Sequence, residues 1–212
     1  MNWKGLLGKL TARDVFLLSL VVVLYVLVSF FAKSYESYLM QLFLLQSWAG
    51  VIVYIMLIAV GSATPMSTVI FMPMAVVMWG SWWSAVYTMI GWWLGAVVVF
   101  MLTRKYGRPL VVKFVDPERL AKFEGLFPRV NVFWMMVYLR IIFPVDILSF
   151  GLGLVGGIKL WQYVLATLLG IIPPALILAF FAKISIFWQI LMGMILIFLL
   201  LWFFMKKNNK KI

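Results

Sequence analysis

The sequence predicts an all-α integral membrane protein, and three observations lead to this fold class. Of the 212 residues, 66% are hydrophobic and only 11% are charged. The apolar residues form runs of about 20, which is the length that crosses a bilayer as a helix. Lysines and arginines gather in the segments between those runs, as they do on the cytoplasmic side of membrane proteins. A soluble domain of this length is not expected to be so apolar.

Composition also excludes several kinds of function. The net charge is +12, but the basic residues are spread over loops and tails instead of one nucleic-acid-binding face. We therefore expect the bilayer and an anionic membrane lipid as partners, and no nucleic acid. The chain has no cysteine and no histidine, which excludes disulfides, His-dependent phosphatases, zinc hydrolases and haem ligation. We expect no metal, no cofactor and no enzyme activity, because the chain offers no nucleophile–base pair.

The first expected element is a transmembrane helix over residues 15–31, which follows the basic residues Lys4, Lys9 and Arg13. This apolar run is long for a signal peptide and no small-residue cleavage site follows it, so we expect a retained anchor. From residue 34 onward, apolar side chains recur at helical spacing. This pattern predicts an amphipathic helix that lies in the membrane interface.

Residues 48–80 are apolar but contain two prolines and two conspicuous glycines: Gly61, Pro65, Pro73 and Gly80. Proline removes a backbone donor and disfavours a helical conformation just before it. The segment is therefore predicted to form two half-helices in a re-entrant hairpin. Residues 82–103 follow as an uninterrupted transmembrane helix, in which Gly91 and Gly95 are spaced to let another helix approach closely.

The second half of the chain repeats this order. The basic loop 104–130 contains Asp116-Pro117-Glu118, which predicts the start of a second interfacial helix. Residues 131–157 are a second broken apolar segment, interrupted by Pro144. Residues 161–181 and 184–205 are predicted to be two further transmembrane helices.

An offset of 79 residues relates the two halves, since it pairs Pro65 with Pro144, Trp82 with Trp161 and Gly91 with Gly170. We therefore predict one membrane domain, 1–212, that contains two repeats, 34–103 and 113–183. Each repeat has an amphipathic helix, a re-entrant hairpin and a transmembrane helix. Because each copy crosses the membrane once, the second is inverted relative to the first, as in many transporters.

The distribution of basic residues agrees with this topology when both chain ends are cytoplasmic, because only Lys33 and Lys183 then lie outside. Two complete spans in place of each hairpin would give the same charge distribution. The prolines favour hairpins, because a broken backbone at membrane depth must be satisfied by protein or by a water-filled cavity.

The candidate binding site is the run from Leu139 to Gly153. It places Arg140 and Asp146 on either side of Pro144, with Ser149 beyond them, in otherwise apolar surroundings. An ionisable residue at membrane depth indicates a functional site by default. Two interpretations stay open. In the first, Arg140 attracts a lipid phosphate, and Asp146 releases it or carries a proton. In the second, the two charges form a structural pair that joins the hairpin arms.

Two other groups of polar residues are candidates. Pro65, Ser67 and Thr68 are predicted to line the opposite hairpin. Arg104 and Arg108, with Gly107 between them, are either ordinary cytoplasmic basic residues or a patch that docks a lipid headgroup.

These residues resemble the motifs of the DedA superfamily, whose domain is also called the VTT or SNARE-associated domain. The resemblance covers approximately residues 35–183 and rests on three motifs. The first reads Gly91-Trp-Trp-Leu-Gly95 and continues to Phe100-x-x-x-Arg104-x-x-Gly107-Arg108. The second reads Arg140-x-x-x-Pro144-x-Asp146-x-x-x-Phe150-x-x-Gly153, and the third reads Gly170-x-x-Pro173.

The resemblance implies two inverted repeats with re-entrant hairpins and a lipid-moving role. The protein would flip or scramble an anionic phospholipid or undecaprenyl phosphate across a bacterial or archaeal plasma membrane. Whether it forms a homo-oligomer stays open. The best-studied branch carries an acid beside the first hairpin proline, whereas residues 60–75 here have none and offer Ser62, Thr64, Ser67 and Thr68. Proton coupling therefore stays open. The alternatives are an ion-coupled transporter of a small solute and a non-transporting membrane-assembly factor.

Overall fold

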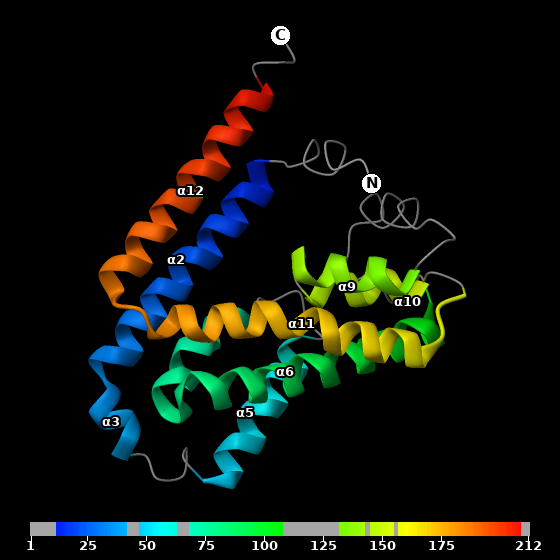
Figure 1. Cartoon of the computed structure of the whole chain (residues 1–212), viewed down its shortest axis with the longest axis horizontal. Helices are drawn as coiled ribbons and strands as arrows, with labels where there is room; N and C mark the ends of the chain where they lie inside the picture. Colours follow the sequence, from blue (N-terminus) through cyan, green and yellow to red (C-terminus); the bar gives the residue numbers. More distant parts are fainter. Residues whose placement is uncertain are drawn as a thin grey trace.

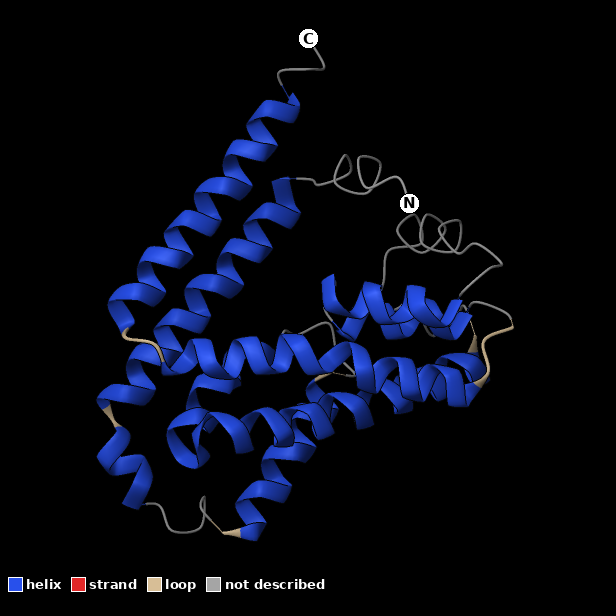
Figure 2. Ribbon diagram, viewed as in Figure 1, coloured by secondary structure: helices blue, strands red, loops and turns tan. Residues whose placement is uncertain are grey.

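A computed structural model describes residues 12–41, 47–62, 68–107, 132–142, 145–154 and 157–208. These residues form helices joined by short turns, with no strand among them, so the predicted all-α fold is confirmed (Figure 2). The helices are, in order, α2 (Ala12–Ser34), α3 (Glu36–Gln41), α5 (Trp48–Gly61), the short 3₁₀ helix η1 (Thr68–Phe71), α6 (Met72–Tyr106), α9 (Val132–Ile142), α10 (Val145–Leu154), α11 (Leu160–Lys183) and α12 (Ile186–Asn208).

Three of the described helical stretches are long and apolar enough to cross a membrane: Val15–Ser34, Thr68–Tyr106 and Leu160–Lys183. This length follows from the rise of about 1.5 Å per residue of an α-helix and a hydrocarbon layer about 30 Å thick. Together with the composition, these helices support an integral membrane protein. The last predicted span coincides with α12, whose described apolar stretch, Ile186–Trp202, is shorter.

The centre of the molecule is an antiparallel pair formed by α6 and α11 (Figure 1). At one end the Trp82 ring meets the Phe180 ring edge to face, with 5.1 Å between centroids. At the other end the Arg104 guanidinium donates a hydrogen bond to the carbonyl of Ile158, just before α11 begins. Because the start of one helix thus lies beside the end of the other, the two long helices run in opposite directions.

Each central helix carries a shorter helix that packs closely against one of its glycines. The Cα of Gly91 in α6 lies so near α5 that an added Cβ would stand 2.7 Å from the Cβ of Ile58. An added Cβ at Gly170 in α11 would stand 2.6 Å from the Cβ of Arg140 in α9. Small residues at such positions allow helix backbones to approach and maximise van der Waals contact.

Contacts also cross between the two halves of the chain. In α10, an added Cβ at Gly153 would stand 2.6 Å from the Cβ of Thr103 in α6. At the start of α6, Met72 clusters with Ala179 and Ala182 of α11, and Val69 of η1 packs against this cluster. The two halves of the chain are therefore interlocked.

Two glycines turn the chain into the central helices. Gly80 has φ 74° and interrupts the helical backbone of α6, so this helix is kinked at the boundary that the sequence predicted for the first hairpin. Gly157 has φ 86° and lies in the turn before α11. Residues with a Cβ rarely adopt such angles. An added Cβ at Gly157 would meet nothing within 4 Å, so this glycine serves the turn and not helix packing.

The terminal helices α2 and α12 lie side by side at the edge of this core (Figure 1). The Tyr25 hydroxyl of α2 donates to the Leu178 carbonyl at 2.7 Å, and the Lys33 ammonium donates to the Ile184 carbonyl at 2.5 Å. Helix α2 extends to Ser34, beyond the predicted end at residue 31. The described part of the amphipathic helix predicted from residue 34 is α3, and the helix predicted near residue 116 lies outside the described residues.

The glycine contacts lead to a first prediction. A Cβ at Gly95 would stand 2.5 Å from the backbone carbonyl of Ala59, which cannot move without displacing α5. We expect Gly95→Ala to lower the free energy of unfolding by about 1–3 kcal/mol, the cost of overpacking. Tryptophan fluorescence during thermal unfolding in detergent measures the loss. The matched control is Gly193→Ala, whose Cβ would meet only side-chain atoms of Val22 and Val26, the nearer at 3.3 Å; equal destabilisation of the two variants would contradict the prediction.

Candidate functional site

Arg140 lies in the last turn of α9, and its side chain is only 1% exposed. It is one of the largest fully buried side chains among the described residues. Arginine stays charged at any physiological pH, so burial of its guanidinium is costly unless hydrogen-bond acceptors surround it. The question for this site is therefore which groups accept from it.

Two hydroxyls from other helices accept hydrogen bonds from Arg140. Its Nη2 donates to the Tyr163 hydroxyl of α11 at 2.6 Å and to the Ser149 hydroxyl of α10 at 3.2 Å. In a continuous helix, residues 140 and 149 would be separated by about 13 Å along the axis. The bond to Ser149 therefore shows that α9 and α10 do not continue as one straight helix; residues 143–144, which join them, lie outside the described part of the chain.

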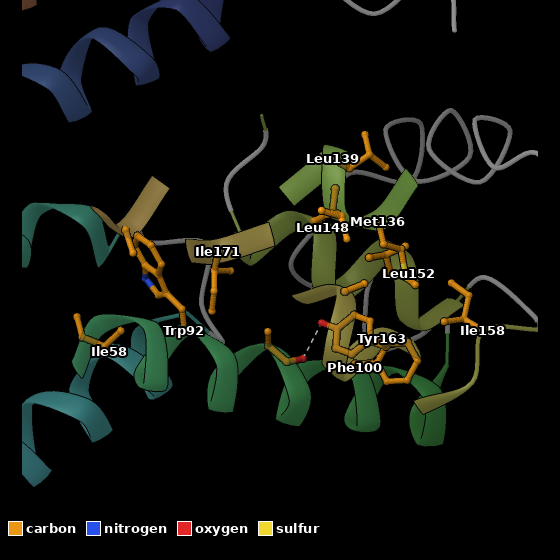
Figure 3. Close-up of a cluster of buried hydrophobic side chains, with 14 residues drawn as sticks. Ile58, Trp92, Phe100, Met136, Leu139, Leu148, Leu152, Ile158, Tyr163 and Ile171 are labelled. Carbon is orange, nitrogen blue, oxygen red and sulfur yellow. Dashed lines mark hydrogen bonds between the residues drawn. The ribbon is translucent and has the colours of Figure 1, made fainter. Parts of the chain in front are cut away.

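Tyr163 connects this pair to α6. Its hydroxyl donates to the backbone carbonyl of Ala96 at 2.9 Å, and its ring stacks on Phe100 with centroids 3.9 Å apart and an interplanar angle of 19° (Figure 3). The Arg140 guanidinium lies 5.1 Å from the centroid of the Tyr163 ring, within the range of a cation–π contact. Tyr163 thus holds Arg140 both by its hydroxyl and by its ring.

The packing of α9 on α11 explains why Arg140 is buried at this point. Its Cβ lies against Gly170, where a larger residue would collide with it, and Gly170 also faces the backbone carbonyl of Val137. In the first half, Gly91 faces the carbonyl of Ile55 and the Cβ of Ile58 in the same arrangement. Arg140 consequently stands in the second half where the fully buried Ile58 stands in the first.

The first half contains its own set of buried hydrogen bonds, made by uncharged groups. The Trp92 indole donates to the Thr68 hydroxyl at 2.7 Å, which joins α6 to η1 after the first predicted break. The hydroxyls of Tyr54 and Thr88 lie 2.7 Å apart and join α5 to α6. Of the residues predicted to line this hairpin, Thr68 is therefore placed in a polar contact that fixes the helices.

The other predicted residues of the two hairpins are placed only in part. Asp146 is the second residue of α10, and its side chain is outside what the structure describes. Pro65, Ser67 and Pro144 likewise fall outside the described residues. Ser62 is 1% exposed, and its hydroxyl donates to the Ala59 carbonyl at 3.0 Å.

The basic motif at the end of α6 is separate from the buried arginine. Arg104 is exposed, and its guanidinium lies 5.1 Å from the centroid of the Phe100 ring. Gly107 ends the helix with φ 68°, and its N–H donates to the Thr103 carbonyl at 2.7 Å. Arg108 lies beyond the described residues. Phe100 thus contacts both the exposed Arg104 and the buried Tyr163.

Sequence reasoning missed Tyr163, which is 0% exposed. It follows Trp161 at the start of a predicted span, the place where aromatic residues usually anchor helices to the interface. Its one sequence signal is that it falls on the same helix face as Gly170, seven residues later, and so faces the packed side. Among the described residues, no group of three or more acidic, histidine or cysteine side chains could hold a metal ion.

The described residues are helical, three of their stretches have bilayer length, and an arginine is buried at the end of α9. These features define an integral membrane protein with a polar site inside its helix bundle. The family model of the VTT domain matches residues 51–184, and the chain belongs to this family, that of the DedA proteins. No curated protein and no solved structure matches the chain.

The hydrogen bonds of Tyr163 lead to a second prediction. Tyr163→Phe removes an acceptor of Arg140 and the donor to Ala96, and we expect it to lower the free energy of unfolding by about 1–3 kcal/mol. The matched control is Thr167→Val, one turn further along α11. Thr167 is also 0% exposed, and its hydroxyl has no hydrogen-bond partner in the described part of the chain. Thermal unfolding in detergent compares the two, and a loss in Thr167→Val as large as in Tyr163→Phe would contradict the assignment.

Proposed function

We propose that this protein moves an anionic membrane lipid, a phospholipid or a polyprenyl phosphate, between the leaflets of a bilayer. The observation that carries the proposal is the buried guanidinium of Arg140 at the break between α9 and α10. A guanidinium matches the oxygens of a phosphate with paired N–H donors, and it keeps its charge inside a protein. A polar site of this kind lowers the barrier for an anionic headgroup in the hydrocarbon layer.

The architecture proposed for this activity is an inverted repeat. Three observations support it. The central helices α6 and α11 are antiparallel, and α5 and α9 pack in the same way on Gly91 and Gly170. In addition, α10 packs on α6, and the start of α6 packs on α11. Each broken segment is then a re-entrant hairpin that enters from its own side of the membrane. Two such hairpins meeting inside the bilayer are a recurrent design for sites with alternating access.

In this proposal Arg140 attracts the lipid phosphate, and Asp146 assists its release or carries a proton. Ser149 and Tyr163 hold the guanidinium in place. Pro65, Ser67 and Thr68 belong to the opposite hairpin, which has no acidic residue over 60–75. Proton coupling through the first hairpin is therefore not part of the proposal.

The remaining expectations belong to the same proposal. The partners are the bilayer and an anionic lipid, without nucleic acid, and no covalent step occurs. The protein resides in the plasma membrane of a bacterium or archaeon with both chain ends in the cytoplasm. The positive charge of the C-terminal lysines Lys206, Lys207, Lys210 and Lys211 agrees with this orientation. A homo-oligomer is compatible with this arrangement.

A third prediction tests transport directly. In vesicles that contain the purified protein and a fluorescent phosphatidylglycerol, dithionite bleaching reports the movement of inner-leaflet lipid to the outer leaflet. We expect Arg140→Gln to slow this movement at least about tenfold, because a hydrogen-bonded charge contributes about 1.5–3 kcal/mol. Arg140→Lys, which keeps the charge but not the paired donors, should lie between. Asp146→Asn tests the release step in the same assay.

The control is Lys183→Gln, which removes an exposed cation from the end of α11. Equal translocation by all variants would show that Arg140 and Asp146 are structural. A non-transporting assembly factor would leave wild-type vesicles no faster than protein-free ones, while Arg140→Gln still lowered stability. A small-solute transporter would also leave the lipid in place, but it would take up a solute when a proton or sodium gradient is applied.

A fourth prediction concerns the topology. The chain has no natural cysteine, so single cysteines can be placed without further changes. Trp83 and Trp161 stand near the starts of the two central spans and are 60% and 57% exposed. We expect a membrane-impermeant maleimide to label Trp83→Cys and Trp161→Cys from opposite sides of the membrane. Labelling of both from the same side would contradict the inverted repeat.

The same background distinguishes a re-entrant hairpin from two complete spans. In Ser67→Cys the thiol should resist labelling from both sides, because the tip of a re-entrant hairpin lies within the bilayer. Two complete spans would instead expose it on the side opposite Trp48→Cys, which serves as the reference.

A further inference from the structure

A shallow cavity of about 300 Å³ lies where α6 ends and α11 begins. Phe100, Met101, Arg104 and Lys105 of α6 line it together with Leu160 of α11. It opens outward from the pair of central helices and is distinct from the buried surroundings of Arg140. The sequence pointed to this region only through its basic motif.

The cavity combines two exposed cations with apolar walls. None of the described lining residues is acidic. Arg104 is held in position, because it donates to the Ile158 carbonyl and lies over the Phe100 ring. The bond to Ile158 uses one of the several N–H donors of the guanidinium. Leu160 is the first residue of α11, so the positive end of a 24-residue helix adjoins the two cations.

The apolar walls have the character of a surface that meets lipid chains. Met101 is 46% exposed and Leu160 is 45% exposed, one from each central helix. A free inorganic phosphate would gain nothing from these side chains, whereas an amphiphile places its anionic head on the cations and its chain along the walls. Basic pockets between membrane helices on the cytoplasmic side are suited to anionic headgroups for this reason.

We propose that this cavity, the Arg104–Lys105 pocket, binds the phosphate headgroup of an anionic phospholipid, with the first part of an acyl chain against Met101 and Leu160. The role of the pocket as the place where cargo is captured rests on the proposed function. The inner wall of the pocket is Phe100, which stacks on Tyr163, and Tyr163 accepts a hydrogen bond from Arg140. One pair of stacked rings therefore separates the exposed cations from the buried one.

Binding of lipid to the purified protein in a neutral detergent, measured by native mass spectrometry, tests the pocket. The probes are dioleoyl phosphatidylglycerol, dioleoyl phosphatidylcholine and inorganic phosphate. We expect the wild type to bind phosphatidylglycerol more tightly than phosphatidylcholine, and Lys105→Gln to weaken phosphatidylglycerol binding about fivefold.

Arg104→Gln should weaken phosphatidylglycerol binding at least as much, but it also removes the bond to Ile158. Lys105→Gln is therefore the primary variant, because the Lys105 ammonium contacts the exposed ring of Tyr106, 5.5 Å away, and not the backbone.

The matched control is Lys183→Gln, since Lys183 follows Arg104 by 79 residues, the offset of the predicted repeat, and is also exposed. Three results would overturn the pocket: unchanged binding in Lys105→Gln, an equal loss in Lys183→Gln, or displacement of the lipid by millimolar inorganic phosphate. Binding and translocation are measured on the same preparations. A wild type that binds phosphatidylglycerol through Lys105 but does not translocate it would disprove the proposed function and leave the pocket standing.

Discussion

The burial of one cation constrains the arrangement of the helices. A guanidinium cannot be neutralised by giving up its proton, so its burial must be offset by acceptors and by a polarisable ring. Arg140 finds these in Ser149 of α10 and Tyr163 of α11, and Tyr163 is itself fixed by the Ala96 carbonyl of α6. The relative position of four helices therefore depends on one network. Such buried networks define a unique arrangement when their members are satisfied.

The two halves of the protein use the same scaffold for different purposes. A glycine in each central helix admits a shorter helix, and the residue that packs on it is Ile58 in one half and Arg140 in the other. The first half joins its broken segment to α6 through the uncharged pair of Trp92 and Thr68. The second half joins its broken segment to α11 through the charged side chain of Arg140. The polar site is consequently asymmetric even though the helix packing is nearly repeated.

The helices and their breaks were largely predictable, because both depend on local sequence. Apolar runs of sufficient length mark α2 and α11, and a lone arginine in an apolar run marks Arg140 as unusual. Gly80 coincides with the kink because only glycine tolerates its φ of 74°. The partners of Arg140 were not predictable in the same way. Tyr163 looks like an interface aromatic in the sequence, and the Ala96 carbonyl is a backbone group that leaves no trace in it.

The sequence by itself determined that this is a helical membrane protein with two broken apolar segments, since hydropathy and proline act over neighbouring residues. The tertiary structure decided what surrounds the charge. Tyr163 is 23 residues from Arg140 and 67 from Ala96 along the chain, and the three meet only because α9, α11 and α6 pack together. Contacts across such distances arise from shape and close approach at glycines, which no periodicity in the chain encodes.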